Sequence, residues 1–136
     1  MDVLSLQLNA HLGLERCNDP QLLTLPFADH LTNHMNSMHA TALFGLAEAA
    51  SGEFLIRGRG DRKDIGGVVR RATSKYSAAA TNQVTATSKT NPDTLVNAIE
   101  AVDAKGRALV AVEIELTEKS GNKIGQFTFD WLLAKT

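Results

Sequence analysis

The stretch that decides the fold is NHMNSMHATALFGLAEAASGE, residues Asn33–Glu53. It opens as a polar loop with histidines and asparagines and continues as a helix built mostly of alanine, leucine and glycine. Small residues recur in this helix every three or four positions, at Ala42, Gly45, Ala49 and Gly52. That spacing puts them on one face. Because an interior glycine costs about 1 kcal/mol relative to alanine, we expect another backbone to pack closely against this face.

The chain around this stretch has the composition of one folded domain, residues 1–136. A length of 136 residues is enough to bury a single core. The apolar content of 43% and the net charge of -1 argue against disorder and against a surface for polyanions. Aromatic residues make up only 5% of the chain and leave few side chains for stacking on bases. We therefore expect no nucleic-acid partner.

The sequence also predicts a soluble, cytoplasmic protein with no membrane partner. No apolar run reaches the roughly 18 residues that suggest a membrane-spanning helix. Residues Met1–Ser5 lack the basic start and the long apolar stretch of a signal peptide. Cys17 is the single cysteine, so the chain can form no intramolecular disulfide and no zinc site built on a cysteine cluster.

The periodicities before and within the long helix predict three elements. Residues 2–12 have the spacing of a short helix, and residues 14–27 read as a strand interrupted by a turn at Asn18-Asp19-Pro20. The long helix runs from about His39 to Ile56, and Gly58 and Gly60 end it.

The second half of the chain predicts an antiparallel sheet with a small helix inserted. Strands are expected at residues 65–78, 83–88, 109–117 and 124–133. Strict alternation in the first of these would put Arg70 and Arg71 on opposite faces. Asn91-Pro92-Asp93 has the features of a helix start, and that helix continues to about Ala104. One long apolar helix against one sheet of about five strands is a two-layer α+β domain.

Glu48 is the first candidate for chemistry, because its helix neighbours are apolar. A carboxylate desolvated in such a place has a raised pKa, which suits a general base, and its oxygen can also act as a nucleophile. The alternative is a solvated helix residue, since buried acids are rare.

The helix N-terminus is the second candidate. Its first backbone N–H groups, near His39 and Ala40, lie at the positive end of the helix dipole and could bind an oxyanion. The alternative is ordinary capping by Ser37 or His39. Asn33 and Asn36 could orient a carbonyl or a water, or could simply shape the loop.

Other chemistries fit the sequence poorly. His30, His34 and His39 lack the carboxylate spacing of a metal motif, so we expect no metal site. No GxSxG element is present for a Ser-His-Asp triad. A basic run follows the long helix, at Arg57, Arg59, Arg62 and Lys63. It is either a solvated charge run or a contact for the phosphates of a nucleotide-bearing ligand.

The order Asn33, then His39-Ala40-Thr41, then Glu48 resembles the signature of hotdog-fold acyl-CoA thioesterases. In that family the pattern is an asparagine, a short loop, His-Gly-Gly and an acid on the central helix. The resemblance covers about Leu14 to Leu133, and the helix inserted after Asn91 is similar to that of an uncharacterised branch of the superfamily. It implies a hotdog fold, in which a curved antiparallel sheet wraps a long central helix.

The resemblance also implies roles for individual residues. Glu48 takes the position of the catalytic general base or nucleophile, and Asn33 that of the residue holding the water or the thioester carbonyl. The N–H of Ala40 stands where the oxyanion donor lies, with His39 as an orienting residue. The family's Gly-Gly is Ala40-Thr41 here, and the added side chains narrow the approach of the pantetheine arm.

The implied partners are an acyl-CoA or an acyl-carrier thioester, with no cofactor beyond the coenzyme A of the substrate. Family members are homodimers whose sheets join edge to edge, or homotetramers, with active sites between protomers. Tyr76 and Ser77 would then face Glu48 of the partner subunit, and Arg57 and Arg59 are candidates for substrate binding.

Two other functions remain open. His34 and Glu48 are fourteen residues apart, the spacing found in hotdog dehydratases that act on 3-hydroxyacyl thioesters, although the Phe-Pro-Gly and Pro-Gly elements of that branch are missing. A non-catalytic protein that binds acyl-CoA or a fatty acyl chain is the other alternative, and the replaced glycines favour it.

Overall fold

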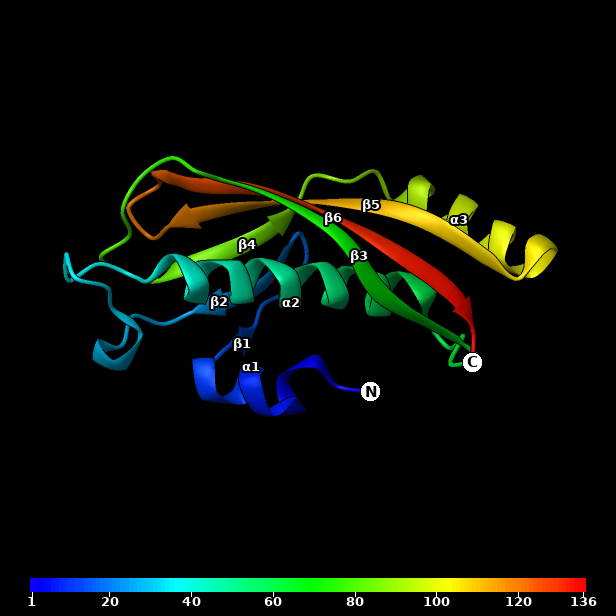
Figure 1. The fold of residues 1–136 in the computed structure, drawn as a ribbon, viewed down its shortest axis with the longest axis horizontal. Helices are drawn as coiled ribbons and strands as arrows, with labels where there is room; N and C mark the ends of the chain where they lie inside the picture. The colour runs from blue at the N-terminus through cyan, green and yellow to red at the C-terminus, as the bar shows by residue number, and fades with distance from the viewer.

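A computed structural model of residues 1–136 shows one long helix, α2 (Ala40–Arg59), lying along the inner face of a curved antiparallel sheet (Figure 1). The sheet has six strands, and the predicted α+β architecture is confirmed. In spatial order they are β1 (Glu15–Arg16), β2 (Gln21–Leu25), β4 (Val84–Ser88), β5 (Arg107–Glu118), β6 (Lys123–Lys135) and β3 (Ile65–Tyr76). The turn at residues 18–20 divides the first predicted strand into β1 and β2, which accounts for the sixth strand.

Helix α2 is longer than predicted. It ends at the cap residue Gly60, so Gly58 lies inside the helix, and Arg57 and Arg59 belong to its last turn rather than to a basic loop. Gly58 is required by packing: a Cβ there would lie 2.0 Å from Leu95 Cδ2. The glycines of α2 thus meet side chains from other elements, including Trp131 beside Gly52, and not the second backbone that the sequence predicts.

The N-terminal segment covers the side of α2 that faces away from the sheet (Figure 1). The predicted helix over residues 2–12 is divided at Leu6 into a 3-10 helix, Val3–Ser5, and α1 (Gln7–Leu12). Leu12 packs on Gly45 so closely that a Cβ at that glycine would lie 2.7 Å from Leu12 Cδ1. Helix α2 is thus enclosed between the sheet and this segment.

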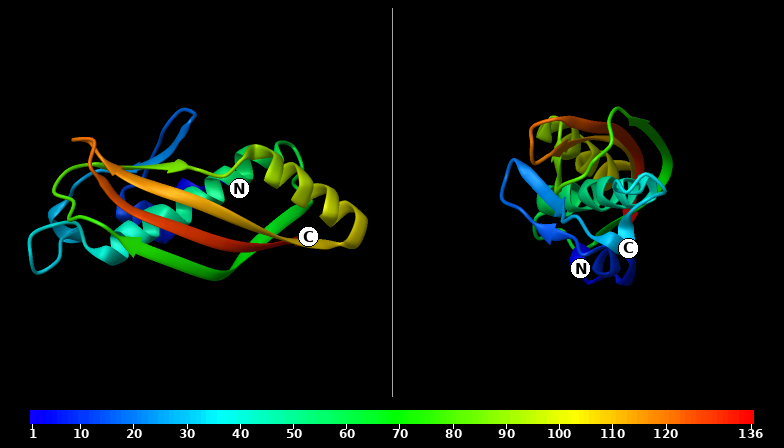
Figure 2. Two further views of the ribbon diagram at one scale, coloured as in Figure 1. Left: turned by 90° about the horizontal axis from the view of Figure 1, so that it is seen from above. Right: turned by 90° about the vertical axis from the view of Figure 1, so that its left-hand side faces the viewer.

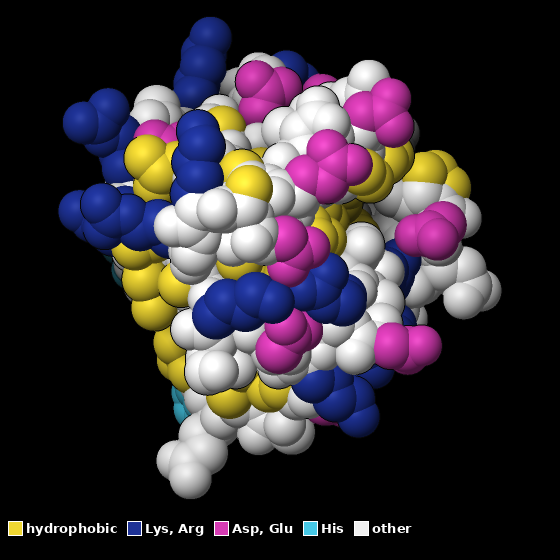
Figure 3. All heavy atoms as spheres, turned by 90° about the vertical axis from the view of Figure 1, so that its right-hand side faces the viewer, with side chains coloured by type: hydrophobic (Ala, Val, Ile, Leu, Met, Phe, Trp, Pro, Cys, Tyr) yellow, Lys and Arg dark blue, Asp and Glu magenta, His cyan; other side chains and the backbone are white.

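Helix α3 (Pro92–Lys105) packs against β5 and against the C-terminal part of α2 (Figures 1 and 2). Its predicted start is confirmed, because the Asn91 side chain accepts a hydrogen bond of 2.9 Å from the Asp93 N–H. A charge network joins this end of the molecule: Arg62 and Lys135 both bind Asp64 and Asp103 (Figure 3 views this end).

Strand β3 is an edge strand that pairs only with β6. From Gly67 to Tyr76 every residue except Val69 is exposed. Its register shifts between Val69, which pairs with Trp131, and Arg71, which pairs with Asp130. Arg70 is the extra residue of this bulge, so the strict alternation predicted for the strand is wrong at this point.

No helix of the structure combines the length and the apolar character needed to cross a membrane.

Candidate functional site

A cavity of about 150 Å³ lies beside the second half of α2, where the N-terminal segment, β3, β6 and α3 converge. Its wall is mainly apolar, formed by Val3, Leu6, Leu55, Ile99, Trp131 and Leu133 among others. Three polar side chains also line it, those of Asn9, Glu48 and Arg59. Asn9 is occupied, because its Nδ2 donates to the Val3 carbonyl at 3.0 Å.

Glu48 is the carboxylate of this cavity. It is half-buried, and its side chain makes no hydrogen bond and no ion pair within the chain. Burial raises the pKa of Glu48, because no positive charge or donor compensates the lost hydration. An unpaired carboxylate with a raised pKa is suited to taking a proton near neutral pH.

Two hydrogen bonds hold Trp131, which lines the cavity together with Glu48. The hydroxyl of Ser51 donates to the Glu48 carbonyl at 2.6 Å and accepts from Trp131 Nε1 at 3.0 Å. Ser51 is fully buried, so these two bonds fix the indole ring against the helix beside Glu48.

The start of α2 is capped by a side chain, but not all of its backbone donors have partners. The Nδ1 atom of His39, the N-cap residue, accepts from the Thr41 N–H at 3.0 Å. This is the capping role for His39 that the sequence left open. The Ala40 N–H makes no hydrogen bond within the chain and is exposed. It can therefore donate to a ligand at the positive end of the helix.

The Tyr76 side chain, at the end of β3, also lies at the N-terminus of α2. Its hydroxyl donates to the Ala40 carbonyl at 3.3 Å, while its ring packs edge-on against Phe127 at a centroid separation of 5.4 Å. Ser77 follows it, with its N–H bonded to the Ile124 carbonyl at 2.8 Å.

Asn33 organises the loop before the helix. Its Oδ1 accepts from the Met35 and Ser37 N–H groups, at 2.9 and 3.1 Å, and from the Ser37 hydroxyl at 3.2 Å. These donors fix the orientation of the amide, and they leave the Nδ2 group without a partner in the chain. Asn33 can therefore still donate to a carbonyl. His34, in the same loop, is exposed and makes no hydrogen bond.

The predicted residues fall into two groups along α2. Asn33, His39, Ala40, Thr41 and Tyr76 lie at or beside its N-terminus, whereas Glu48 and Arg59 line the cavity. Glu48 follows Ala40 by eight positions, which correspond to about 12 Å along the helix axis. One thioester carbonyl cannot contact both groups of a single chain at hydrogen-bonding distance.

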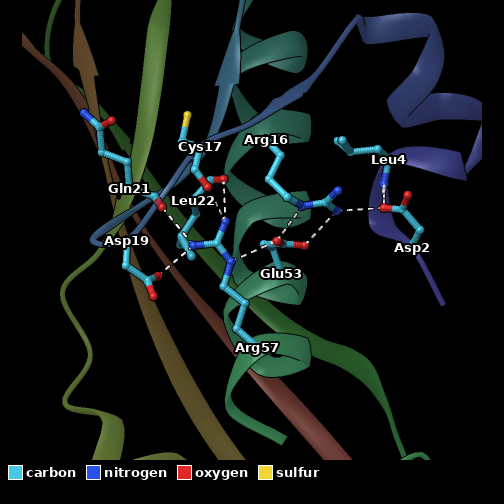
Figure 4. A network of polar contacts seen from close by, with 9 residues as sticks. All are labelled: Asp2, Leu4, Arg16, Cys17, Asp19, Gln21, Leu22, Glu53 and Arg57. Carbon is cyan, nitrogen blue, oxygen red and sulfur yellow. Dashed lines mark hydrogen bonds and ion pairs between the residues drawn. The ribbon is translucent and has the colours of Figure 1, made fainter. Parts of the chain in front are cut away.

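Arg57 belongs to neither group. It donates to Glu53 at 2.9 Å, to Asp19 at 2.7 Å and to three backbone carbonyls around the β1–β2 turn (Figure 4). Arg16 binds the other side of Glu53 at 2.9 and 3.2 Å, and it also binds Asp2 at 2.7 Å. The guanidinium predicted to meet a substrate instead ties α2 to the N-terminal strands.

Glu53 is the residue that sequence reasoning missed. It is only 4% exposed and is thus the most buried acid of the chain. Burial alone would raise the pKa of Glu53, but hydrogen bonds from Arg16 and Arg57 outweigh it and hold the pKa below its usual range. The i,i+4 spacing of Glu53 and Arg57 could have indicated the pair, whereas nothing local indicates Arg16.

Arg59 remains the basic side chain of the cavity. One terminal nitrogen, Nη1, donates to the Ile65 carbonyl at 2.6 Å, and its buried Nε has no partner. Nowhere in the chain do three histidine, cysteine or carboxylate side chains gather as metal ligands would.

Comparison with known proteins places the chain among folds of this kind. The family model "Domain of unknown function (DUF4442)" matches residues 17–133. A protein of unknown function from Pseudomonas aeruginosa, described as a probable thioesterase, superimposes with a TM-score of 0.84 at 20% identity, over 98% of this chain and 91% of that one. No curated protein matches the chain.

Two further structures support the same fold. A protein of unknown function from Chlorobaculum tepidum has a TM-score of 0.83 at 19% identity, over 97% of this chain and 88% of that one. A Bacillus halodurans protein solved with CoA has a TM-score of 0.73 at 16% identity, over 95% of this chain and 76% of that one. The central helix, the curved sheet and these matches confirm the predicted hotdog fold, and the chain belongs to the DUF4442 family.

Proposed function

We propose that the protein hydrolyses acyl-CoA thioesters and that Glu48 activates the attacking water. The observation that carries the proposal is the position of Glu48, an unpaired carboxylate facing an apolar cavity, with a pKa raised by burial. The cavity offers apolar surface to an acyl chain, and Glu48 offers the base that hydrolysis needs. The probable thioesterase among the similar structures, and the one that holds CoA, agree with this chemistry.

In this mechanism the Glu48 carboxylate takes a proton from water while the water oxygen bonds to the thioester carbon. The carbonyl oxygen becomes an oxyanion, which accepts from the Ala40 N–H and the Asn33 Nδ2 group. The C–S bond then breaks, and the thiolate leaves with the proton that Glu48 had taken. The products are the carboxylic acid and free coenzyme A.

The distance between the groups implies that two copies of the chain form each site. Because Ala40 and Glu48 lie about 12 Å apart along one helix, the oxyanion donors of one copy would act with Glu48 of the partner subunit. The free edge of β3 offers a surface for this pairing, since its outer N–H and C=O groups have no partner strand. We therefore propose a homodimer at least, joined through β3.

An acyl-CoA series of increasing chain length, with detection of the released thiol, tests the activity. Wild type should release thiol, and Glu48→Gln should lose at least a hundredfold in kcat while keeping its fold. Glu15→Gln is the matched control, because it removes an exposed carboxylate that makes no side-chain hydrogen bond and no ion pair.

The alternatives predict different results in the same experiment. Tight acyl-CoA binding without turnover by wild type would contradict the hydrolase and leave a binding protein. Hydration of an enoyl-CoA, lost in His34→Ala, would indicate the dehydratase.

A further inference from the structure

The outer face of the sheet carries a second hollow, a groove of about 670 Å³. Its walls come from three neighbouring strands: Arg70 and Arg71 of β3, Asp130 and Leu132 of β6, and residues 107–109 of β5. The helix cavity is bounded by Trp131 and Leu133, which alternate with the groove residues along β6. The sheet therefore separates the two hollows.

The bulge in β3 brings a second arginine of that strand to the groove. In a regular strand Arg70 and Arg71 would point to opposite faces. The extra residue at Arg70 breaks the alternation, so both side chains line the groove. Bulges commonly redirect side chains in this way near binding sites.

The arginines of the groove are the ones without partners. Arg70, Arg71 and Arg107 make no side-chain hydrogen bond and no ion pair, although Asp130 lies directly across from Arg71 in the β3–β6 ladder. Every other arginine of the chain donates at least one hydrogen bond: Arg16, Arg57, Arg59 and Arg62. Three guanidiniums that converge around the single carboxylate of Asp130 leave an excess of positive charge, and an anion would relieve their mutual repulsion.

An apolar row lies at the groove: Leu109 and Leu132 line it, and Val68 continues the row beside it. Val68, Leu132 and Leu109 lie opposite one another in the β3–β6–β5 ladders. Leu109 is 67% exposed and Val68 59% exposed, which is unusual for large apolar side chains on a sheet. The pair of Arg71 and Asp130 lies on one side of this apolar row, and the pair of Arg107 and Ala134 lies on the other.

We propose that this groove binds a nucleotide. The phosphates are held by Arg70, Arg71 and Arg107, whose planar forks match phosphate oxygens in pairs. The base lies on the apolar row, and Asp130 accepts from an amino or ribose hydroxyl group. A second copy of the chain is a poor occupant, because two such faces would each bring three arginines and one aspartate together.

The nucleotide can be free or can be the nucleotide part of coenzyme A, and binding measurements separate the two. Titration calorimetry with ADP, coenzyme A, adenosine and pyrophosphate is the direct test. We expect ADP to bind, adenosine to bind at least tenfold more weakly, and Arg70→Gln, Arg71→Gln and Arg107→Gln each to weaken ADP at least tenfold. If coenzyme A uses the groove, ADP will compete with it and the same variants will weaken it equally.

Two controls keep this result distinct from the proposed hydrolysis. Lys75→Gln removes an exposed positive charge from the same strand outside the groove and should leave ADP binding unchanged. Glu48→Gln should also leave it unchanged, so nucleotide binding can hold even if the hydrolase proposal fails.

Three results would overturn the proposal. One is the lack of ADP binding at millimolar concentration. Another is ADP binding that the arginine variants do not change. The third is an acidic peptide that binds the groove more tightly than ADP and loses that binding in the arginine variants.

Discussion

Glu48 and Glu53 lie five residues apart on one helix and have opposite surroundings. Glu48 faces an apolar cavity without a partner, whereas Glu53 is enclosed by Arg16 and Arg57. The pKa of Glu48 is raised by burial, and that of Glu53 is lowered because its hydrogen bonds outweigh burial. Two acids on the same helix thus serve different purposes, one suited to proton transfer and the other to holding the N-terminal strands on α2.

The largest expected effect of this difference is on turnover. Glu48→Gln should reduce acyl-CoA hydrolysis by about 10² to 10⁴-fold, the usual contribution of a general base. It should leave the free energy of unfolding unchanged or raise it slightly, because an unpaired, desolvated carboxylate is removed. Thiol release and urea unfolding measure the two quantities. Retained turnover would remove Glu48 from the mechanism.

The second effect should be on stability alone. Glu53→Gln removes the buried carboxylate that Arg16 and Arg57 share, while each arginine keeps one exposed carboxylate partner. It should lower the free energy of unfolding by about 1.5–3 kcal/mol. Turnover per folded molecule should stay near that of wild type. If Glu53→Gln lost turnover without losing stability, the division of roles between the two acids would be wrong.

Two glycines of α2 extend the comparison to packing. Gly58→Ala places a methyl group against the buried Leu95 and should cost about 1–2 kcal/mol. Gly52→Ala meets only Trp131 and Val3 at ordinary contact distance and should stabilise the helix by about 0.5–1 kcal/mol. Equal effects of the two changes on the thermal midpoint would contradict the close approach of α3 at Gly58.

The smallest effects are on pH dependence, and they have opposite signs for Glu48 and Glu53 because their pKa values shift in opposite directions. Hydrolysis needs ionised Glu48, so its rate should rise with pH through a midpoint above the usual glutamate range. Because the folded-state pKa of Glu48 is raised, its ionisation costs stability as pH rises through that value. Glu53 has a lowered folded-state pKa, so its contribution is present above the unfolded-state value and is lost as pH falls through the folded one.

Acid unfolding of wild type and Glu53→Gln tests the loss of stability at low pH that is expected from Glu53. Wild type should lose stability steeply in the acid range, and Glu53→Gln should show a shallower loss. If the free energy of unfolding fell equally with pH in wild type and in Glu53→Gln, Glu53 would not be the source of the acid sensitivity.

The sequence could predict the elements whose signals are local. The Asn91 cap, the turn at Asn18-Asp19-Pro20 and the long helix all follow from neighbouring residues, and the structure confirms them. The predicted end of α2 is wrong because glycine is a common stop signal, whereas Gly58 lies inside the helix and makes room for Leu95 of α3.

The site was harder to predict because its geometry depends on distant contacts. Glu48 was identified from its apolar neighbours, and it lines the cavity. Glu53 also has apolar neighbours, and although Arg57 four residues on hints at an ion pair, its second partner, Arg16, is distant in sequence. The bulge at Arg70 depends on pairing with β6, which no pattern within β3 indicates.

That bulge has a consequence for how the family can diverge. Because Arg70 is one extra residue, losing it is a single-codon deletion that leaves the ladder on both sides paired as before. Such a deletion would remove one guanidinium from the outer groove and leave the helix cavity untouched. Among homologues, a one-residue gap at this position would mark the proteins that have lost one of the two β3 arginines of the groove. This gap should occur independently of the residue at position 48.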